Sequence, residues 1–363
     1  MKLVADSGLW STGPPVAPTP LVAVLEVSGA VLSWGVDDEP SAAAIAFTDP
    51  AHADWLWRVL GESGHSAVAS ALAGRQPDRA QTIELAGVGL QPGSVDELRR
   101  LAIGHWLRRW WPASHRDGIV ALDPAVLDAE IALLTAAAQD FFADDTFDSD
   151  VTGLLSPHAA ALGALVRDGD PRVAELIRAA GELTDDVGIA IDEPAQAMPR
   201  RDDYALAAGS DGRTGIVGAV ARGTSSLDWG CVPPGMFDAA ENTIDWRVEV
   251  TDAATNAVVT VALSGPASPS GIAVRLHSGD FSGAGVLDDD GRATFPIVDA
   301  QRVPVTESVA WNHVWRAVAV TVGVAVGESV ESRDRVRDFA RSRLAEPGAD
   351  AYLAEILAAE ADY

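Results

Sequence analysis

The sequence contains very little cysteine and lysine. Cys231 is the only cysteine among 363 residues, which excludes an intramolecular disulfide framework and a cysteine-ligated structural zinc. Lys2 is the only lysine, so no other position offers a lysine that could form a Schiff base or bind a phosphate. Positive charge is therefore almost all arginine, and with abundant alanine, glycine, valine and aspartate this composition indicates a GC-rich bacterial source. A reducing cytoplasm is the compartment that fits these observations.

Positive charge is also scarce in total, because 26 basic residues stand against 53 acidic ones and the net charge is −27 at pH 7. Affinity for nucleic acid and for anionic lipid comes from Lys and Arg, so we expect neither nucleic acid nor a membrane as a partner. The acids are densest between residues 121 and 202, which hold 17 acids and 5 arginines. A solvated acidic surface is the simpler interpretation, and a dock for a basic partner is the alternative.

Long apolar runs are absent as well. The longest, Ala317–Val326, is too short to span a bilayer, and the N-terminal residues lack the apolar core of a signal peptide. Hydrophobic residues nevertheless make up 48% of the chain, which predicts that most of it folds. We expect a cytoplasmic protein of two or three domains.

The order of the predicted elements indicates an α+β multi-domain fold. Thr243–Val250, with the sequence TIDWRVEV, has the period-two pattern of a half-buried strand. Further short strands, the last of them at Val314–Val322, follow without helices between them. Such a series favours an antiparallel β-sandwich-like domain over a parallel α/β sheet. The predicted domains are a small α+β region at 1–92, a helical region at 93–191, a linker at 192–203, the β-sandwich-like domain at 204–328 and a C-terminal helical clasp at 329–363.

Local signals refine these elements. Prolines before Leu21–Val27 place that strand at a sheet edge or on a detached arm. Ser94 and Glu97 have the spacing of a capping box, and Asp123 before a proline marks a second helix start. Asp288–Gly291 is a natural hairpin turn between two strands of the β domain.

Catalytic motifs are missing. The sequence has no nucleophile elbow, phosphate loop or dinucleotide fingerprint, and its seven histidines are dispersed. Cys231 has no neighbouring base, which favours a small apolar role in a Pro-Gly loop. The acidic run Asp144–Asp150 lacks the ordered spacing of a calcium loop, so a solvated loop is the expected structure. We predict no metal and no cofactor.

The segment His105–Trp111, with the sequence HWLRRWW, is the main local anomaly. Trp106 and Trp110 share one helix face with Ile103, which is typical of core packing, whereas Trp111 and the arginines lie off that face. Tryptophan and arginine are enriched at interfaces. This helix either docks on acidic helices of its own chain or binds an acidic partner. The predicted binding residues are Arg99, Arg100, Trp106, Arg108, Arg109, Trp110 and Trp111.

The sequence thus predicts a non-catalytic protein-protein interaction or accessory protein with a protein partner. One alternative is a metal-dependent hydrolase with a site between the helical region and the β domain, because catalytic groups commonly converge from distant positions. Another is a structural subunit of a larger assembly. The first candidates for the hydrolase site are Asp228, Glu241, His277 and His313.

Overall fold

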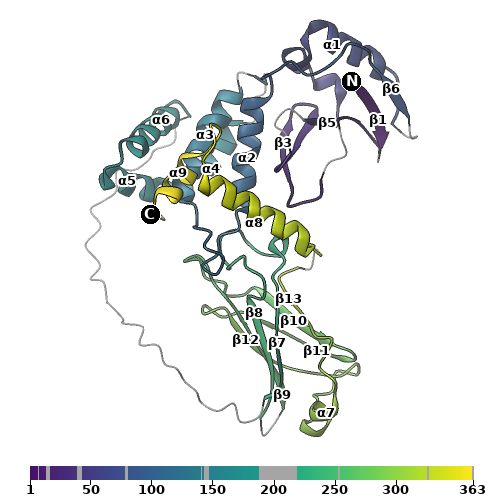
Figure 1. Cartoon of the computed structure of the whole chain (residues 1–363), viewed down its shortest axis with the longest axis vertical. Helices are drawn as coiled ribbons and strands as arrows, with labels where there is room; N and C mark the ends of the chain where they lie inside the picture. Colours follow the sequence, from purple (N-terminus) through teal and green to yellow (C-terminus); the bar gives the residue numbers. More distant parts are fainter. Residues whose placement is uncertain are drawn as a thin grey trace. The chain divides into compact units, whose positions relative to one another are not determined.

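The computed structural model describes residues 1–6, 8–13, 17–38, 43–77, 81–139, 141–142, 147–187, 219–251, 254–324 and 327–361 (Figure 1). These residues form α-helices and three antiparallel sheets, which confirms the α+β multi-domain fold. The chain divides into two compact units. The predicted linker 192–203 and residues 204–218 of the predicted β domain lie outside the described residues. The first unit contains residues 1–111, 122–195 and 331–363, and the second contains 112–121 and 196–330.

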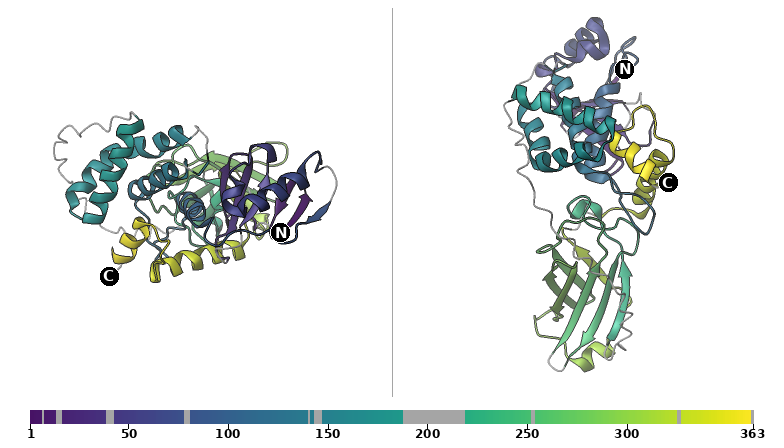
Figure 2. Two further views of the ribbon diagram at one scale, coloured as in Figure 1. Left: turned by 90° about the horizontal axis from the view of Figure 1, so that it is seen from above. Right: turned by 90° about the vertical axis from the view of Figure 1, so that its left-hand side faces the viewer.

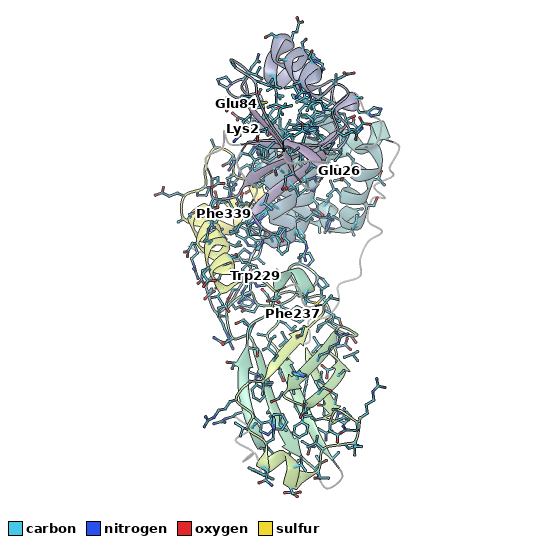
Figure 3. The ribbon with its side chains drawn as sticks, turned by 90° about the vertical axis from the view of Figure 1, so that its right-hand side faces the viewer. Lys2, Glu26, Glu84, Trp229, Phe237 and Phe339 are labelled. Atoms are coloured by element: carbon cyan, nitrogen blue, oxygen red, sulfur yellow. The ribbon has the colours of Figure 1, made fainter. Side chains whose placement is uncertain are left out.

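A six-stranded antiparallel sheet opens the first unit. The strand predicted over Leu21–Val27 lies at an edge of this sheet, as expected. Residues 2–6 and 9–12 also form strands, which the sequence did not predict. At the other edge of the sheet, residues 2–4 pair with residues 82–84, and Lys2 lies opposite Glu84 (Figure 3). In spatial order the strands are β3 (Val22–Val27), β4 (Ala30–Gly35), β5 (Ala44–Phe47), β2 (Leu9–Thr12), β1 (Lys2–Asp6) and β6 (Thr82–Glu84).

Helices complete the first unit (Figure 2). They are α1 (Leu56–Leu72), α2 (Asp96–Trp110), α3 (Pro124–Gln139), α4 (Phe147–Leu155), α5 (Ala159–Asp168), α6 (Pro171–Val187), α8 (Val330–Ala345) and α9 (Leu353–Ala361).

Helix α2 is central to this packing, since it contacts both β3 and α3, and α3 in turn contacts α4, α6 and α9. The C-terminal helix α8 packs on α2 through Phe339, whose ring meets that of Trp106 edge to face at 5.4 Å. The C-terminal helices therefore pack on the first unit rather than forming a body of their own.

The two predicted helix starts differ in outcome. Asp123 caps α3 as expected, because its Oδ1 accepts hydrogen bonds from the N–H groups of Ala125 and Val126 at 2.8 and 3.0 Å. The predicted capping box at α2 is wrong. The Ser94 hydroxyl donates instead to the carbonyl of Gln91 at 2.7 Å, and no side chain caps the first turn of α2.

The second unit is an antiparallel β-sandwich. One sheet has the order β12 (Arg292–Pro296), β9 (Thr255–Val261), β8 (Ile244–Val250), β7 (Ala219–Ser225), and the other has the order β11 (Phe281–Val286), β10 (Ala273–Ser278), β13 (Ala319–Val322).

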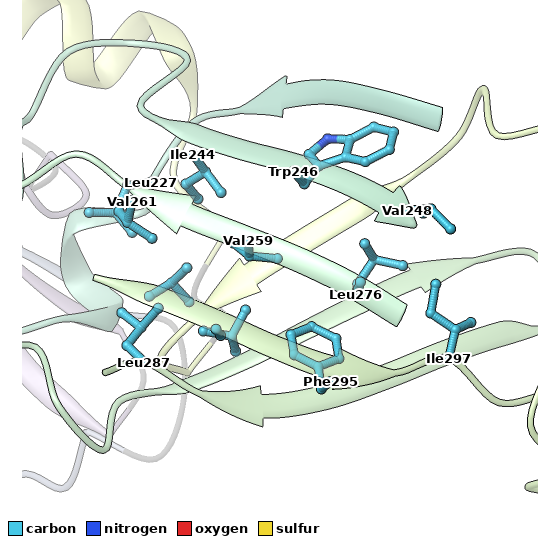
Figure 4. Packing of buried hydrophobic residues seen from close by; sticks show 14 of the residues in the cluster. Leu227, Ile244, Trp246, Val248, Val259, Val261, Leu276, Leu287, Phe295 and Ile297 are labelled. Atoms are coloured by element: carbon cyan, nitrogen blue, oxygen red, sulfur yellow. The ribbon is translucent and has the colours of Figure 1, made fainter. Parts of the chain in front are cut away.

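The alternation read from TIDWRVEV holds in β8, where the side chains of Ile244, Trp246 and Val248 are buried. They meet Leu276 of the other sheet in a common apolar core (Figure 4). This burial explains why the period-two pattern was a reliable signal.

The two sides of the sandwich differ over the described residues. Val298, just after β12, forms bridges with Ser282 of β11 and with Pro304, and so links the two sheets along one side. On the other side, β7 and β13 are each the last strand of their sheet among the described residues. The turn at Asp288–Gly291 forms, but the strands that it joins belong to different sheets.

A single buried aspartate ties the segment 112–121 into the second unit. Asp238 accepts hydrogen bonds from the Ser114 hydroxyl at 2.7 Å and from the N–H groups of His115, Arg116 and Ala240 at 2.9–3.4 Å. Burial by itself would raise the pKa of Asp238, but these donors hold it below its ordinary value.

Replacing Gly104 tests the close packing of α2. A Cβ at this position would lie 2.2 Å from the Tyr352 hydroxyl and 2.8 Å from Ile131. We expect Gly104→Val to lower the free energy of unfolding by about 1–3 kcal/mol through overpacking. Gly153→Ala in α4 is the control, because a Cβ there meets nothing within 4 Å and should stabilise by about 0.5–1 kcal/mol. Denaturant titration followed by circular dichroism measures both, and an unchanged midpoint for Gly104→Val would contradict the packing.

Asp238 also predicts a pH dependence. Since its folded-state pKa lies below the unfolded value of about 3.9, its contribution to stability is complete at neutral pH and is lost as the pH falls through the folded-state pKa. Asp238→Asn should cost on the order of 2–3 kcal/mol at neutral pH, because an amide offers one acceptor oxygen instead of two. The free energy of unfolding of this variant should vary less than wild type between about pH 5 and pH 2. Equal acid dependence of the two proteins would refute this role.

Candidate functional site

Carboxylates of the same unit hold Arg99, Arg100 and Arg108 of α2. Arg99 Nη1 lies 3.1 Å from Asp350 Oδ2, and Arg100 pairs with Glu130. Arg108 Nε lies 2.9 Å from Asp128 Oδ1. These contacts correspond to the first of the two predicted alternatives, in which the helix docks on acidic residues of its own chain.

The same network reaches the C-terminal segment. Glu355 is fully buried and pairs with Arg343, whose guanidinium also approaches Asp350 at 3.3 Å. Burial would raise the pKa of Asp350, but Arg343 and Arg99 hold it below its usual range. For Glu130, burial outweighs the pairing with Arg100 and raises the pKa.

The three predicted tryptophans occupy different settings. Trp106 is buried and donates from Nε1 to the carbonyl of Pro20 at 2.6 Å. Trp110 and Trp111 are half-buried at the C-terminal end of α2, and Arg109 stacks over the Trp110 ring at 4.3 Å. The partly exposed end of the predicted binding helix is therefore Arg108, Arg109, Trp110 and Trp111.

A cavity of about 520 Å³ lies beside the buried arginines. Arg335, in its lining, pairs with Asp37 at 2.6 Å, and Arg99 and Arg343 pair with Asp350. These lining charges already neutralise one another. None of these paired groups is therefore left to bind a charged ligand in the cavity.

The hydrolase candidates do not form a recognisable metal site. Over the part of the chain that the structure describes, no group of three or more His, Cys, Asp or Glu side chains is placed to hold a metal ion. Asp228 Oδ2 accepts from Gly327 N at 3.2 Å, and His277 is exposed on β10. His313 Nε2 lies 2.9 Å from Ser278 Oγ. Glu241 is half-buried just before β8, and residues 144–146 of the acidic run lie outside the described residues.

Large exposed apolar side chains follow one another closely along a segment that the sequence did not indicate. Four lie within twelve residues around α7 (Glu307–Asn312), the helix between β12 and β13 at one end of the sandwich (Figure 1). We call them the α7 patch. Its residues and exposed fractions are Val303 at 55%, Val309 at 45%, Trp311 at 54% and Val314 at 65%.

An aromatic frame holds the α7 patch in place. The His313 ring lies 4.6 Å from the ring of Phe281 and 4.6 Å from that of Trp315. Its Nε2 contacts the buried Ser278, and Trp315 Nε1 donates to the carbonyl of Ala310 at 2.9 Å. Trp311 therefore projects from an ordered support.

The sequence predicted one strand over Val314–Val322, but only Ala319–Val322 is a strand. The signal that could have revealed the α7 patch is the mixture of a tryptophan and several valines with polar residues between Val303 and Val314. Burial decides what such a residue does, and burial depends on tertiary contacts.

Comparisons with protein-family models, with curated proteins and with solved structures find no match to this chain. Among the described residues, no helix has the length and apolar character needed to cross a membrane.

Breaking the buried ion pair tests the internal docking of α2 and the C-terminal helices. Glu355→Ala leaves the Arg343 guanidinium buried without its main partner, and we expect a loss of about 3–5 kcal/mol in the free energy of unfolding. Glu182→Ala removes a solvent-exposed partner of Arg178 and should cost at most about 0.5 kcal/mol. Thermal and denaturant unfolding measure both, and similar small losses would show that the buried pair is not structural.

Proposed function

We propose that this chain is a non-catalytic protein-binding protein whose second unit recognises a partner protein through the α7 patch. The observation that supports this is four exposed apolar side chains within twelve residues, two of them on α7 and two in the segments that flank it. Single exposed apolar residues are normal on any protein surface, whereas a group of them marks an interaction site more often.

Trp311 is the central residue of this proposal. Tryptophan is enriched among the residues that contribute most to binding, because one rigid ring fills a pocket and loses little conformational entropy. The frame of Phe281, His313 and Trp315 orders its neighbours before binding. An ordered support lowers the entropic cost of association and so raises affinity.

The partly exposed end of α2 remains the alternative surface of the same function. Arg108 and Trp111 have the residue types of an interface, but Arg108 also pairs with the buried Asp128. A variant of Arg108 therefore changes internal structure together with any contact to a partner. Trp311 has no such contact to a buried charge among the interactions that the structure shows, and it provides the cleaner test.

A paired substitution tests the proposal. The protein should be affinity-purified from the cells that produce it, and the co-purifying proteins should be quantified and then bound to the purified chain. We expect Trp311→Ala to weaken binding of a specific partner at least about 30-fold, since truncation of such a residue costs 2 kcal/mol or more.

Trp57→Ala is the matched control. Trp57 is 48% exposed in the first unit, close to the 54% of Trp311, so its removal should leave the same partner bound. If Trp311→Ala retains every partner of the wild type at equal unfolding temperature, the α7 patch is not the binding site. Equal loss with Trp57→Ala would point to nonspecific apolar adhesion instead. A fixed oligomer that withstands dilution and Trp311→Ala would favour a structural subunit.

A further inference from the structure

Strand β7 is at the edge of its sheet among the described residues. It pairs with β8 along Ala219–Ser225, and no other described strand lies next to it in the sheet. The opposite side of the sandwich is closed by the bridges of Val298, so this openness is not a general property of the unit. A strand edge presents a row of unpaired backbone N–H and C=O groups to any extended segment.

Two arginines lie directly opposite each other beside this edge. Arg222 of β7 and Arg247 of β8 are cross-strand partners on the outer face of the sheet. Like charges in this position destabilise a sheet, by a few tenths of a kcal/mol or more. Arg247 pairs with Glu249, but no described carboxylate lies within ion-pair distance of Arg222. Arg222 therefore keeps an uncompensated positive charge among the described residues, in a chain whose net charge is −27.

A hollow of about 600 Å³ lies over this arginine pair. We call it the β7 hollow. Its arginines and threonines can bind a carboxylate, because guanidinium groups bind carboxylates in a bidentate manner and threonine hydroxyls donate to them. Asp245, in the same lining, has the opposite effect. The main residues that line it are Arg222, Thr224, Asp245, Arg247, Val258 and Thr260.

A second unsatisfied group, on β8, lies beside the inner face of β7. Gly223 lies opposite Trp246, and a Cβ at residue 223 would come within 2.5 Å of the indole ring. The indole Nε1 lies 3.2 Å from that position, is buried, and has no hydrogen-bond partner. An unpaired buried donor costs free energy, which an acceptor on a neighbouring strand would recover.

We propose that the open edge of β7 binds an extended acidic segment of a partner protein as an additional strand. Backbone hydrogen bonds to β7 provide affinity, and a carboxylate in the β7 hollow, facing Arg222, provides specificity. The overall negative charge does not prevent this, because at physiological salt charges beyond about 8 Å are largely screened and the local arginine pair dominates. The proposal goes beyond the role of the α7 patch and does not depend on it.

A synthetic peptide tests the proposal on the full chain. The probe is a peptide of about eight residues with alternating valine and threonine, in which glutamate replaces one central threonine. Two matched peptides carry glutamine or lysine at that position. Calorimetry gives the dissociation constants, and amide NMR shifts show whether residues 219–225 are the contact.

We expect the glutamate peptide to bind at least about fivefold more tightly than the glutamine peptide, and the lysine peptide more weakly than both. Arg222→Gln should remove the preference for glutamate. Arg275→Gln is the control, because Arg275 is exposed on the central strand of the other sheet, and it should leave the preference unchanged.

Two further results separate strand addition from simple ion pairing. Two further peptides are methylated on alternate backbone nitrogens, one at the odd positions and one at the even positions. One of them should lose binding and the other should keep it, because only one edge of an added strand faces β7. If both methylated peptides still bind, strand addition is overturned. Binding of no peptide at millimolar concentration, or an Arg222-dependent dimer of the chain in sedimentation, would overturn the proposal.

Discussion

Arginine and carboxylate groups pair inside the first unit, and the packing of its helices depends on these pairs. Arg343 and the fully buried Glu355 join α8 to α9, while Asp350 between those helices also binds Arg99 of α2. A charge removed from water must be compensated by an opposite charge and by hydrogen bonds. The pairs therefore hold together segments about 250 positions apart in the sequence.

This constraint changes the meaning of the Arg- and Trp-rich helix. The chain has twice as many acids as bases, so an arginine that is buried finds a carboxylate easily. Arg99, Arg100 and Arg108 are partners of acids in their own unit, and Trp106 is a core residue. Residue types that are enriched at interfaces serve here largely in packing. Of the predicted binding residues, Arg108 is exposed, while Arg100, Arg109, Trp110 and Trp111 are half-buried.

The features that suggest recognition lie in the sandwich and are of two kinds. Around α7, apolar side chains are exposed on an ordered support. At β7, no described strand pairs with the outer edge, and Arg222 lies opposite another arginine rather than an acid. The first kind favours a partner with an apolar pocket, and the second favours an extended acidic segment. Both follow from what the fold leaves uncovered.

The sequence by itself determined the features that rest on local periodicity and capping. The alternation in TIDWRVEV reports one buried face of β8, and Asp123 caps α3 through its own backbone neighbours, so neither depends on distant contacts. Other features were decided only by tertiary structure. Ser94 bonds to Gln91 instead of capping α2, the turn at Asp288 joins two different sheets, and Trp311 stays exposed while Trp106 is buried. The reason is that burial, ion pairing and strand-edge openness depend on which distant segments come together, and residue spacing along one chain does not contain that information.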